Sequence, residues 1–169
     1  MNIFLVGFMG SGKSVTGKKL AKRLNLQFLD LDREIEEVQG EAIPEIFKNR
    51  GEPYFRELEG KTLFNLAGQS GFVIALGGGT PCSQDNWDFI ENNGLSIYLK
   101  EKADVLFGRL RKEKALRPLI SDLGDAELKS YIHNTLKSRS IFYDQAVVCY
   151  DKSKMTWSEL LEIIETYIK

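Results

Sequence analysis

The fold is decided by the stretch Gly7-Phe-Met-Gly-Ser-Gly-Lys13-Ser14, which matches the phosphate-binding pattern G-x-x-x-x-G-K-[ST]. A short apolar run precedes it, and the segment from Lys13 to Leu24 has the apolar spacing of a helix. The glycines allow successive backbone N–H groups to turn toward phosphate oxygens, and the helix points its positive end at the same place. The stretch therefore predicts a nucleotide-binding loop between a strand and a helix.

The side chains of this loop have expected partners on the nucleotide. Lys13 places a positive charge near the β- and γ-phosphates, and the Ser14 hydroxyl can coordinate Mg²⁺. The loop residues expected to bind ATP are Gly10, Ser11, Gly12, Lys13, Ser14 and Val15, and Arg117 is expected to bind ATP from outside the loop. The guanine-recognition motif Asn-Lys-x-Asp is absent from the sequence, which argues against a GTPase switch. No motif, however, distinguishes ATP from GTP as the phosphoryl donor.

Length and composition favour a single domain, residues 1–169. The 23 basic and 24 acidic side chains give a net charge of −1, so no overall field attracts nucleic acid or an anionic membrane. Cys82 and Cys149 lie far apart and lack C-x-x-C spacing, which argues against a zinc site and favours reduced, buried thiols. The apolar start has no basic region, unlike a signal peptide. We expect a cytoplasmic monomer.

Short apolar runs alternate with helix-like stretches along the chain, which predicts a parallel sheet covered by helices on both faces. The further strands are expected at Gln27 to Leu31, Phe72 to Leu76, Leu95 to Leu99 and Ala146 to Tyr150. Thr156 and Glu159 have capping-box spacing at the start of a last helix. The segment from Leu110 to Asp125 is charged and breaks the apolar rhythm, so we expect it to be a mobile flap.

Two acidic residues, Asp30 and Asp32, end the second predicted strand. The period of a strand would put both on one face, at the crevice where such sheets bind ligands. One can serve the metal and the other a substrate hydroxyl. Alternatively, Asp32 caps a helix that begins at Arg33. The strand that ends at Leu76 leads into glycines and not into an acid, so any acid for the metal must come from elsewhere.

Three arginines and a triple glycine are the remaining candidates for the site. Arg56 and Arg139 sit among apolar residues, a setting that suits a planar fork gripping a carboxylate, although each alone could be a surface arginine. Gly77-Gly-Gly79 would let the backbone approach a ligand closely or simply form a tight turn. Arg117, in the predicted flap, could reach a transferring phosphoryl group or remain an exposed loop charge.

Taken together and in this order, the phosphate loop, Asp30-x-Asp32, Phe55-Arg56, the triple glycine, Arg117-Pro118 and Arg139 resemble the shikimate kinase family. The resemblance implies ATP-dependent phosphorylation of the 3-hydroxyl of shikimate, giving 3-phosphoshikimate and ADP on the route to chorismate and aromatic amino acids. It implies a three-layer α/β/α P-loop kinase fold with a five-stranded parallel sheet of strand order 2-3-1-4-5. The implied fold also includes a helical acceptor-binding region at about 31–60 and a lid at about 110–125.

The resemblance also implies a role for each candidate residue. On the phosphate side, Lys13 and Arg117 would stabilise the γ-phosphoryl group, Ser14 would coordinate Mg²⁺, and Asp30 would hold the ion through water. On the acceptor side, Asp32 would bind the hydroxyl and act as general base. The shikimate carboxylate would lie between Arg56 and Arg139, the N–H groups of Gly78 and Gly79 would meet the ring hydroxyls, and Phe47 and Phe55 would wall the pocket.

Two departures and two alternatives remain. Ala75-Leu76 stands where many family members carry a hydroxyl residue, and the adenine contact is undefined, with Arg109 as a candidate. Another small P-loop kinase, acting on gluconate or a nucleoside monophosphate, would share the loop but not the acceptor-side residues. A regulatory nucleotide-binding module without turnover is disfavoured, since Lys13, Asp32 and Arg117 are retained.

Overall fold

The computed structural model describes residues 1–168 and is built on one five-stranded parallel sheet with the order β2-β3-β1-β4-β5, as predicted. The strands are β1 (Asn2–Val6), β2 (Gln27–Asp30), β3 (Phe72–Ala75), β4 (Gly94–Lys100) and β5 (Val148–Asp151). The helices are α1 (Lys13–Leu24), α2 (Leu31–Gln39), α3 (Ile43–Phe64), α4 (Gln84–Asn93), α5 (Ala103–Glu113), α6 (Asp125–Tyr143) and α7 (Trp157–Ile168), with the short 3₁₀ helix η1 (Lys114–Leu116) after α5.

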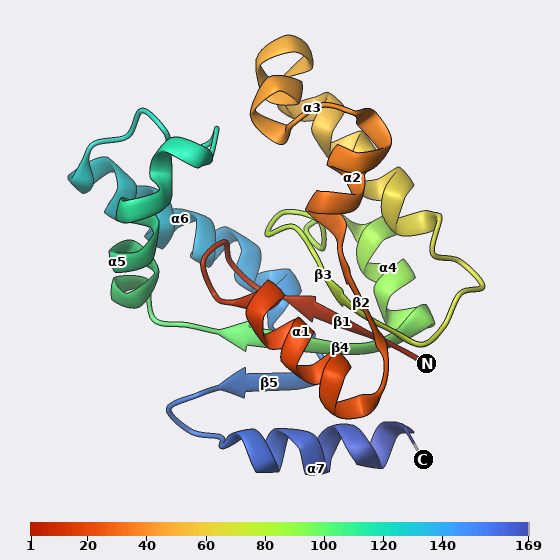
Figure 1. Cartoon of the computed structure of the whole chain (residues 1–169). Helices are drawn as coiled ribbons and strands as arrows, with labels where there is room; N and C mark the ends of the chain where they lie inside the picture. Colours follow the sequence, from red (N-terminus) through yellow and green to blue (C-terminus); the bar gives the residue numbers. More distant parts are fainter. Residues whose placement is uncertain (169) are drawn as a thin grey trace.

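The sheet is covered by helices on both faces, which makes the three layers that the alternating pattern predicts (Figure 1). On one face, Ile3 and Leu5 of β1 pack with Leu20 of α1 and Leu160 of α7. On the other face, Phe4 and Val6 of β1 pack with side chains from α3, α4 and the end of α6. These side chains include Leu63, Trp87 and Tyr143. Because both faces are covered, all five residues of β1 are buried.

Two groups of helices extend beyond the sheet, with the loop between β1 and α1 lying between them in the view (Figure 1). The first group consists of α2 and the first part of α3, which bends at Gly51, where φ is 80°. The second consists of α5, η1 and the start of α6. This second group has its own core, in which Phe8 of the β1–α1 loop packs against Leu106 and Leu128. The loop is thus joined to both the sheet and the outer helices.

The local structure predicted around Asp32 was wrong. Strand β2 ends at Asp30 and helix α2 begins at Leu31, so Asp32 lies in the first helical turn and not on a strand face. It also does not cap a helix that starts at Arg33, because the N-cap position belongs to Asp30. Strand-to-helix switches without an intervening loop carry no turn signal, which is why the periodicity argument extended the strand too far.

The expected lid, residues 110–125, is less loop-like than its composition indicates. Leu110 is fully buried within α5, and Ile120 is fully buried against the same outer core. Leu116 of η1, by contrast, has 77% of its surface exposed. The segment is therefore anchored at two apolar side chains, and exposed residues lie between them and after Ile120.

Some smaller expectations can also be compared with the structure. Thr156 and Glu159 form the predicted capping box, because each side chain accepts a hydrogen bond from the other residue's backbone N–H. Both cysteines are free thiols, but Cys149 is exposed, since β5 is an edge strand with only part of its surface covered. Within residues 1–168, no helix combines the length and apolar character needed to cross a bilayer.

The start of β4 offers a test of the sheet register. Gly94 pairs with Asn2 of β1, and a Cβ atom at Gly94 would overlap the carbonyl oxygen of Asn2. Because backbone atoms cannot move aside as a flexible side chain can, Gly94→Ala is expected to lower the free energy of unfolding by roughly 1–3 kcal/mol, measured by urea denaturation.

Gly108→Ala is the matched control, since a Cβ atom at Gly108 on α5 meets no atom within 4 Å. This change should leave stability unchanged or raise it by about 0.5–1 kcal/mol, because alanine favours the helix more than glycine does. Equal stability of Gly94→Ala and the unmodified protein would contradict the close approach of β1 and β4.

Candidate active site

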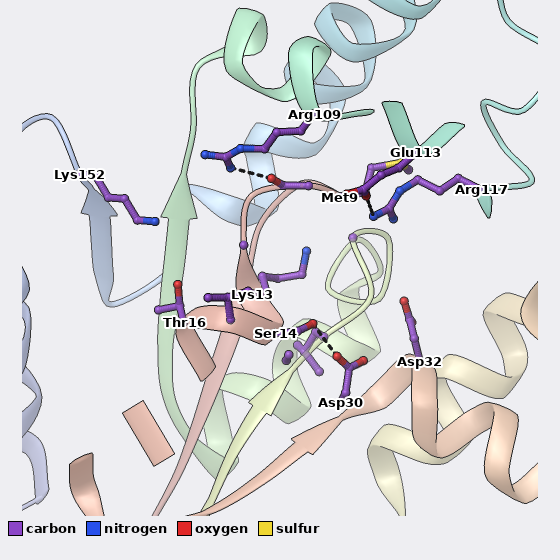
Figure 2. A pocket seen from close by; sticks show the side chains of 16 residues that line it. Met9, Lys13, Ser14, Thr16, Asp30, Asp32, Arg109, Glu113, Arg117 and Lys152 are labelled. Carbon is purple, nitrogen blue, oxygen red and sulfur yellow. Dashed lines mark hydrogen bonds and ion pairs between the residues drawn. The ribbon is translucent and has the colours of Figure 1, made fainter. Parts of the chain in front are cut away.

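Two adjoining cavities open beside the phosphate loop, between the two outer groups of helices. The first, of about 450 Å³, is lined by the loop, by Asp30 and by Arg109 of α5 (Figure 2). The second, of about 290 Å³, is lined by α3, the triple glycine and Arg139 of α6. Both cavities include Met9, Asp32, Gly78 and Arg117 in their walls. A group bound in one cavity can therefore meet a group bound in the other at these four residues.

The phosphate loop has the backbone that its sequence predicts. Gly10 and Gly12 have φ of 78° and 92°, a left-handed conformation that favours glycine, and Gly12 is the N-cap of α1. Among the six loop residues expected to bind ATP, Gly10, Gly12, Lys13, Ser14 and Val15 line the first cavity, as does Arg117. Ser11 does not, because its side chain is buried beneath the loop, 97% covered, with its hydroxyl close to Gly7. For Ser11, only a backbone contact with phosphate is compatible with this position.

Lys13 is held by the loop itself. Its Nζ donates hydrogen bonds to the carbonyl oxygens of Gly7, at 2.8 Å, and Phe8, at 3.0 Å. Burial lowers the pKa of Lys13 to about 8, and the opposing attraction of Asp32 limits the fall. The amine therefore stays largely protonated near neutral pH and is ready to exchange two carbonyl partners for phosphate oxygens.

Ser14 and Asp30 make a pair of oxygen ligands at the floor of the first cavity. Ser14 Oγ donates a hydrogen bond of 2.6 Å to Asp30 Oδ2 (Figure 2). Mg²⁺ prefers oxygen ligands and usually combines one or two protein groups with water and substrate phosphates. A hydroxyl and a carboxylate beside a phosphate loop fit that donor set, so these two residues could hold the ion.

Asp32 lies at the junction of the cavities. Its Oδ1 is buried and makes no hydrogen bond within the described residues 1–168. Burial raises the pKa of Asp32 to about 6, and the nearby negative charges of Glu59 and Asp30 add to the rise. A carboxylate with this pKa is ionised at neutral pH yet accepts a proton readily, which suits a general base.

Arg117 reaches the same junction from the lid. Its Nη2 lies 3.2 Å from Oε2 of Glu113, one helical turn earlier, and its buried Nε has no partner in the part of the chain that the structure describes. Glu113 also lines the first cavity and was missed in the sequence, although the four-residue spacing from Arg117 was a usable signal. The expected alternative of a purely solvent-exposed loop charge does not hold for Arg117.

The second cavity brings together the two arginines predicted to grip a carboxylate. Arg56 is bound by Glu52, with Nη2 2.8 Å from Oε1, and by Glu59, with Nη1 2.5 Å from Oε2. Arg139 Nη1 is buried and has no hydrogen-bond acceptor among residues 1–168. Two guanidinium groups on separate helices thus face one cavity. The predicted walls also lie there, with the rings of Phe47 and Phe55 4.8 Å apart.

The triple glycine packs directly against these charged groups, which a simple tight turn would not require. A Cβ atom at Gly77 would overlap a carboxylate oxygen of Glu59, and one at Gly79 would overlap the guanidinium of Arg56. Glu59 is itself only 1% exposed and accepts a 2.5 Å hydrogen bond from Thr80 Oγ1. The sequence missed Glu59, although its three-residue spacing from Arg56 on a helix indicates a contact.

The remaining residues of the first cavity are the candidates for contact with adenine. Arg109 lines the cavity, but its guanidinium is engaged, since Nη1 donates to Gly10 O at 2.8 Å and Nη2 to Glu101 Oε2 at 3.0 Å. Lys152, which follows β5, also lines this cavity and had no signal in the sequence. Ala75 and Leu76 present apolar side chains here, so no hydroxyl comes from this strand.

Comparison with known proteins gives a consistent result. A sequence model of the family described as "Shikimate kinase" matches residues 9–168. A shikimate kinase of Bacteroides thetaiotaomicron is 41% identical over 155 residues, which cover 92% of this chain and 89% of that protein. The crystal structure of shikimate kinase from that organism superposes with a TM-score of 0.88 at 39% identity, covering 98% of each chain. The structure of an Acinetobacter baumannii shikimate kinase in complex with shikimate also has a TM-score of 0.88, at 31% identity, covering 98% of this chain and 93% of that one.

The raised pKa of Asp32 gives a stability prediction with a definite sign. The folded protein keeps the Asp32 proton up to about pH 6, whereas the unfolded chain releases it near the ordinary pKa of 3.8. The fold therefore loses stability as the pH rises between these two values, and the full penalty is present above pH 6. Asp32→Asn is expected to raise the free energy of unfolding at pH 8 by about 1–3 kcal/mol, with the gain vanishing below about pH 4.

Urea denaturation at pH 8 and pH 4 measures this difference, and the titration of groups that do not interact with Asp32 cancels between the two proteins. Lys13 does interact with Asp32, so its pKa falls further in the variant. Glu91→Gln, an exposed site on α4 outside both cavities, is the control for loss of one negative charge. An Asp32→Asn variant that is less stable than the unmodified protein at pH 8 would mean that the carboxylate is not penalised by burial.

Proposed function

The chain belongs to the shikimate kinase family, and from that premise we propose how its residues carry out the reaction. The reaction is ATP-dependent phosphorylation of shikimate, a step of aromatic amino acid biosynthesis. One observation supports the residue assignment above all others: the two cavities meet at Asp32, Gly78 and Arg117. We assign ATP to the first cavity and shikimate to the second, so that the γ-phosphoryl group lies at the junction.

On the ATP side, the chain supplies positive charge and backbone donors. The N–H groups of the loop around Gly10 and Gly12 would surround the phosphates, at the positive end of α1. Lys13 would leave the carbonyls of Gly7 and Phe8 for the β- and γ-phosphates, and Arg117 would stabilise the charge on the transferring group. Phosphoryl transfer depends mainly on such positioning and charge, because its transition state is loose.

Magnesium is the expected cofactor. Ser14 would coordinate it directly and Asp30 through a water molecule, in keeping with their existing hydrogen bond. When bound, the ion neutralises phosphate charge and orients the phosphates for transfer. Because Asp30 would hold the metal ion, Asp32 remains available to bind the acceptor hydroxyl.

On the shikimate side, Asp32 would accept the proton of the 3-hydroxyl as that oxygen attacks the γ-phosphorus. The bond from the γ-phosphorus to the bridging oxygen would break, giving 3-phosphoshikimate and ADP. Arg56 and Arg139 would bind the carboxylate from α3 and α6, and both line the second cavity. The N–H groups of Gly78 and Gly79 would bind ring hydroxyls. A carboxylate grip opposite a base explains why this site selects a hydroxy acid.

Two segments would complete the site by moving. The acceptor-binding region, about 31–60, and the lid, about 110–125, both contribute residues to the second cavity, and closure would exclude water from the phosphoryl group. We propose that the protein works in this way as a single domain, 1–169, and as a cytoplasmic monomer. Its partners would be ATP and shikimate, without nucleic acid or membrane, in keeping with a net charge of −1.

ADP release with ATP and Mg²⁺ tests the activity directly. The acceptors are shikimate, gluconate, AMP and none. We expect strong stimulation by shikimate alone. Stimulation by gluconate or AMP instead would mean that the protein is a kinase but would overturn the assignment of Arg56 and Arg139. No ADP release with any acceptor would favour a nucleotide-binding module without turnover.

Arg56→Lys tests the carboxylate grip while keeping a positive charge beside buried Glu59. Lysine cannot form the two-pronged contact, so KM for shikimate should rise about 10- to 100-fold with little change in KM for ATP. Arg50→Lys is the matched control, since Arg50 lies on the same helix but contacts Tyr54 outside both cavities. An equal loss for both substrates would argue against a specific contact between Arg56 and shikimate.

A further inference from the structure

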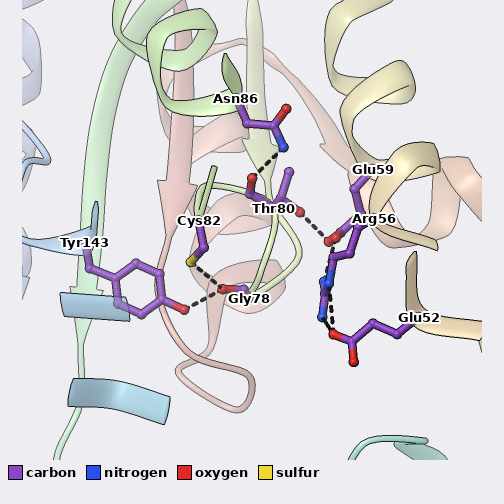
Figure 3. Close-up of polar contacts among 8 residues, drawn as sticks. All are labelled: Glu52, Arg56, Glu59, Gly78, Thr80, Cys82, Asn86 and Tyr143. Atoms are coloured by element: carbon purple, nitrogen blue, oxygen red, sulfur yellow. Dashed lines mark hydrogen bonds and ion pairs between the residues drawn. The ribbon is translucent and has the colours of Figure 1, made fainter. Parts of the chain in front are cut away.

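The carbonyl oxygen of Gly78 accepts two hydrogen bonds from side chains that no step of the proposed reaction uses. Tyr143 Oη, at the end of α6, donates at 2.5 Å, and Cys82 Sγ donates at 3.8 Å. Figure 3 shows both donors on one side of the triple-glycine loop and Arg56 on the other. Tyr143 is fully buried and lines neither cavity. Its hydroxyl therefore acts on the site through the Gly78 carbonyl and through its neighbour Arg139.

The geometry of one peptide unit connects this contact to shikimate binding. The C=O of Gly78 and the N–H of Gly79 belong to the same planar trans peptide, so they point in opposite directions. When Tyr143 and Cys82 hold the carbonyl on one side, the N–H of Gly79 is directed to the other side, where Gly79 and Arg56 line the second cavity.

The neighbouring carbonyls of the loop are also engaged. Thr80 N–H donates to Gly77 O at 3.2 Å, and Cys82 N–H donates to Gly79 O at 2.9 Å. The side chain of Asn86 holds Thr80 O at 2.7 Å. With all three glycine carbonyls bonded within the protein, the loop has one orientation, although glycines alone would permit many. Of the bonds to these three carbonyls, the bond from Tyr143 to Gly78 O comes from a helix that is distant in the sequence.

Both donors keep their protons at neutral pH. Burial raises the pKa of the Cys82 thiol to about 11. Burial also raises the pKa of Tyr143, against the opposing positive charge of Arg139. Arg139 lies one helical turn before Tyr143 on α6, so the same turn presents the predicted carboxylate ligand and the hydroxyl that holds the loop.

We propose that Tyr143, assisted by Cys82, is a positioning residue that fixes the Gly78–Gly79 peptide so that the Gly79 N–H faces bound shikimate. The proposal rests on the assignment of shikimate to the second cavity. It makes α6 a single element that sets two contacts with the acceptor, the Arg139 guanidinium directly and the Gly79 N–H through Gly78. Tyr143 itself touches no reacting atom.

Tyr143→Phe is the central variant, because it removes the hydroxyl and keeps the ring that packs 5.1 Å from the ring of Tyr98. Losing one hydrogen bond that orients a substrate contact is expected to raise KM for shikimate about three- to ten-fold. KM for ATP should change much less, since Gly78 is the one residue of the triple glycine that lines the first cavity and no contact with ATP is assigned to it. Tyr98→Phe is the matched control in the same cluster and should leave both KM values unchanged.

Cys82→Ala removes the second donor and should raise KM for shikimate by about twofold, because a thiol is a weak donor. Since both groups hold one oxygen, Tyr143→Phe combined with Cys82→Ala should raise KM by more than the product of the two single effects. A purely structural role would lower the melting temperature and affect both substrates together, without this selectivity.

The outcomes separate this inference from the proposed function. If the unmodified enzyme does not phosphorylate shikimate, the proposed function fails. If it does, and Tyr143→Phe folds with an unchanged KM for shikimate, the positioning role is overturned. Should Tyr143→Phe fail to fold, Cys82→Ala decides, and an unchanged KM for shikimate in that variant overturns the proposal.

Discussion

The arrangement of the site depends on the complete burial of β1 in the middle of the sheet. A strand covered on both faces and paired on both edges has one possible register, so the point at which its chain leaves the sheet is fixed. The phosphate loop begins at that point and ends in α1, whose inner face packs on the same strand. Phe8 then ties the loop to the outer core of α5 and α6. The positions of the two cavities follow from these contacts.

Opposite charges partly compensate one another where Lys13 and Asp32 are buried beside the two cavities. Lys13 and Arg117 lower the pKa of Asp32, and Asp32 raises the pKa of Lys13, whereas burial alone would favour the neutral form of both Lys13 and Asp32. Arrival of a tetra-anionic nucleotide and a carboxylate would add negative charge near donors, including Arg139 Nη1, that have no acceptor within residues 1–168. The ligands therefore complete a set of interactions that the fold leaves unfinished.

The bounds of α1 and many of the residues that line the site could be predicted because each has a local signature, whereas the sheet order was implied by the family resemblance. The loop pattern fixes β1 and α1, and an arginine among apolar residues indicates a directed charge. Prediction from the sequence failed where the signal is absent or three-dimensional. The switch from β2 to α2 at Leu31 has no turn residue, and Leu110 reads as part of a charged loop although its side chain completes a core. Lys152 and Tyr143 reach the site only through the packing of the last strand and α6, which no spacing reveals.

The two carboxylates that hold Arg56 differ in a way that bears on how shikimate could enter. The Glu52 side chain is 48% exposed, so water can replace Arg56 as its partner at little cost. Glu59 is only 1% exposed and bonded to Thr80, so separating it from Arg56 would leave a buried charge uncompensated. An incoming carboxylate would therefore displace Glu52 and leave Glu59 in place. The guanidinium then keeps its orientation during the exchange, and the triple glycine packed against it keeps its own.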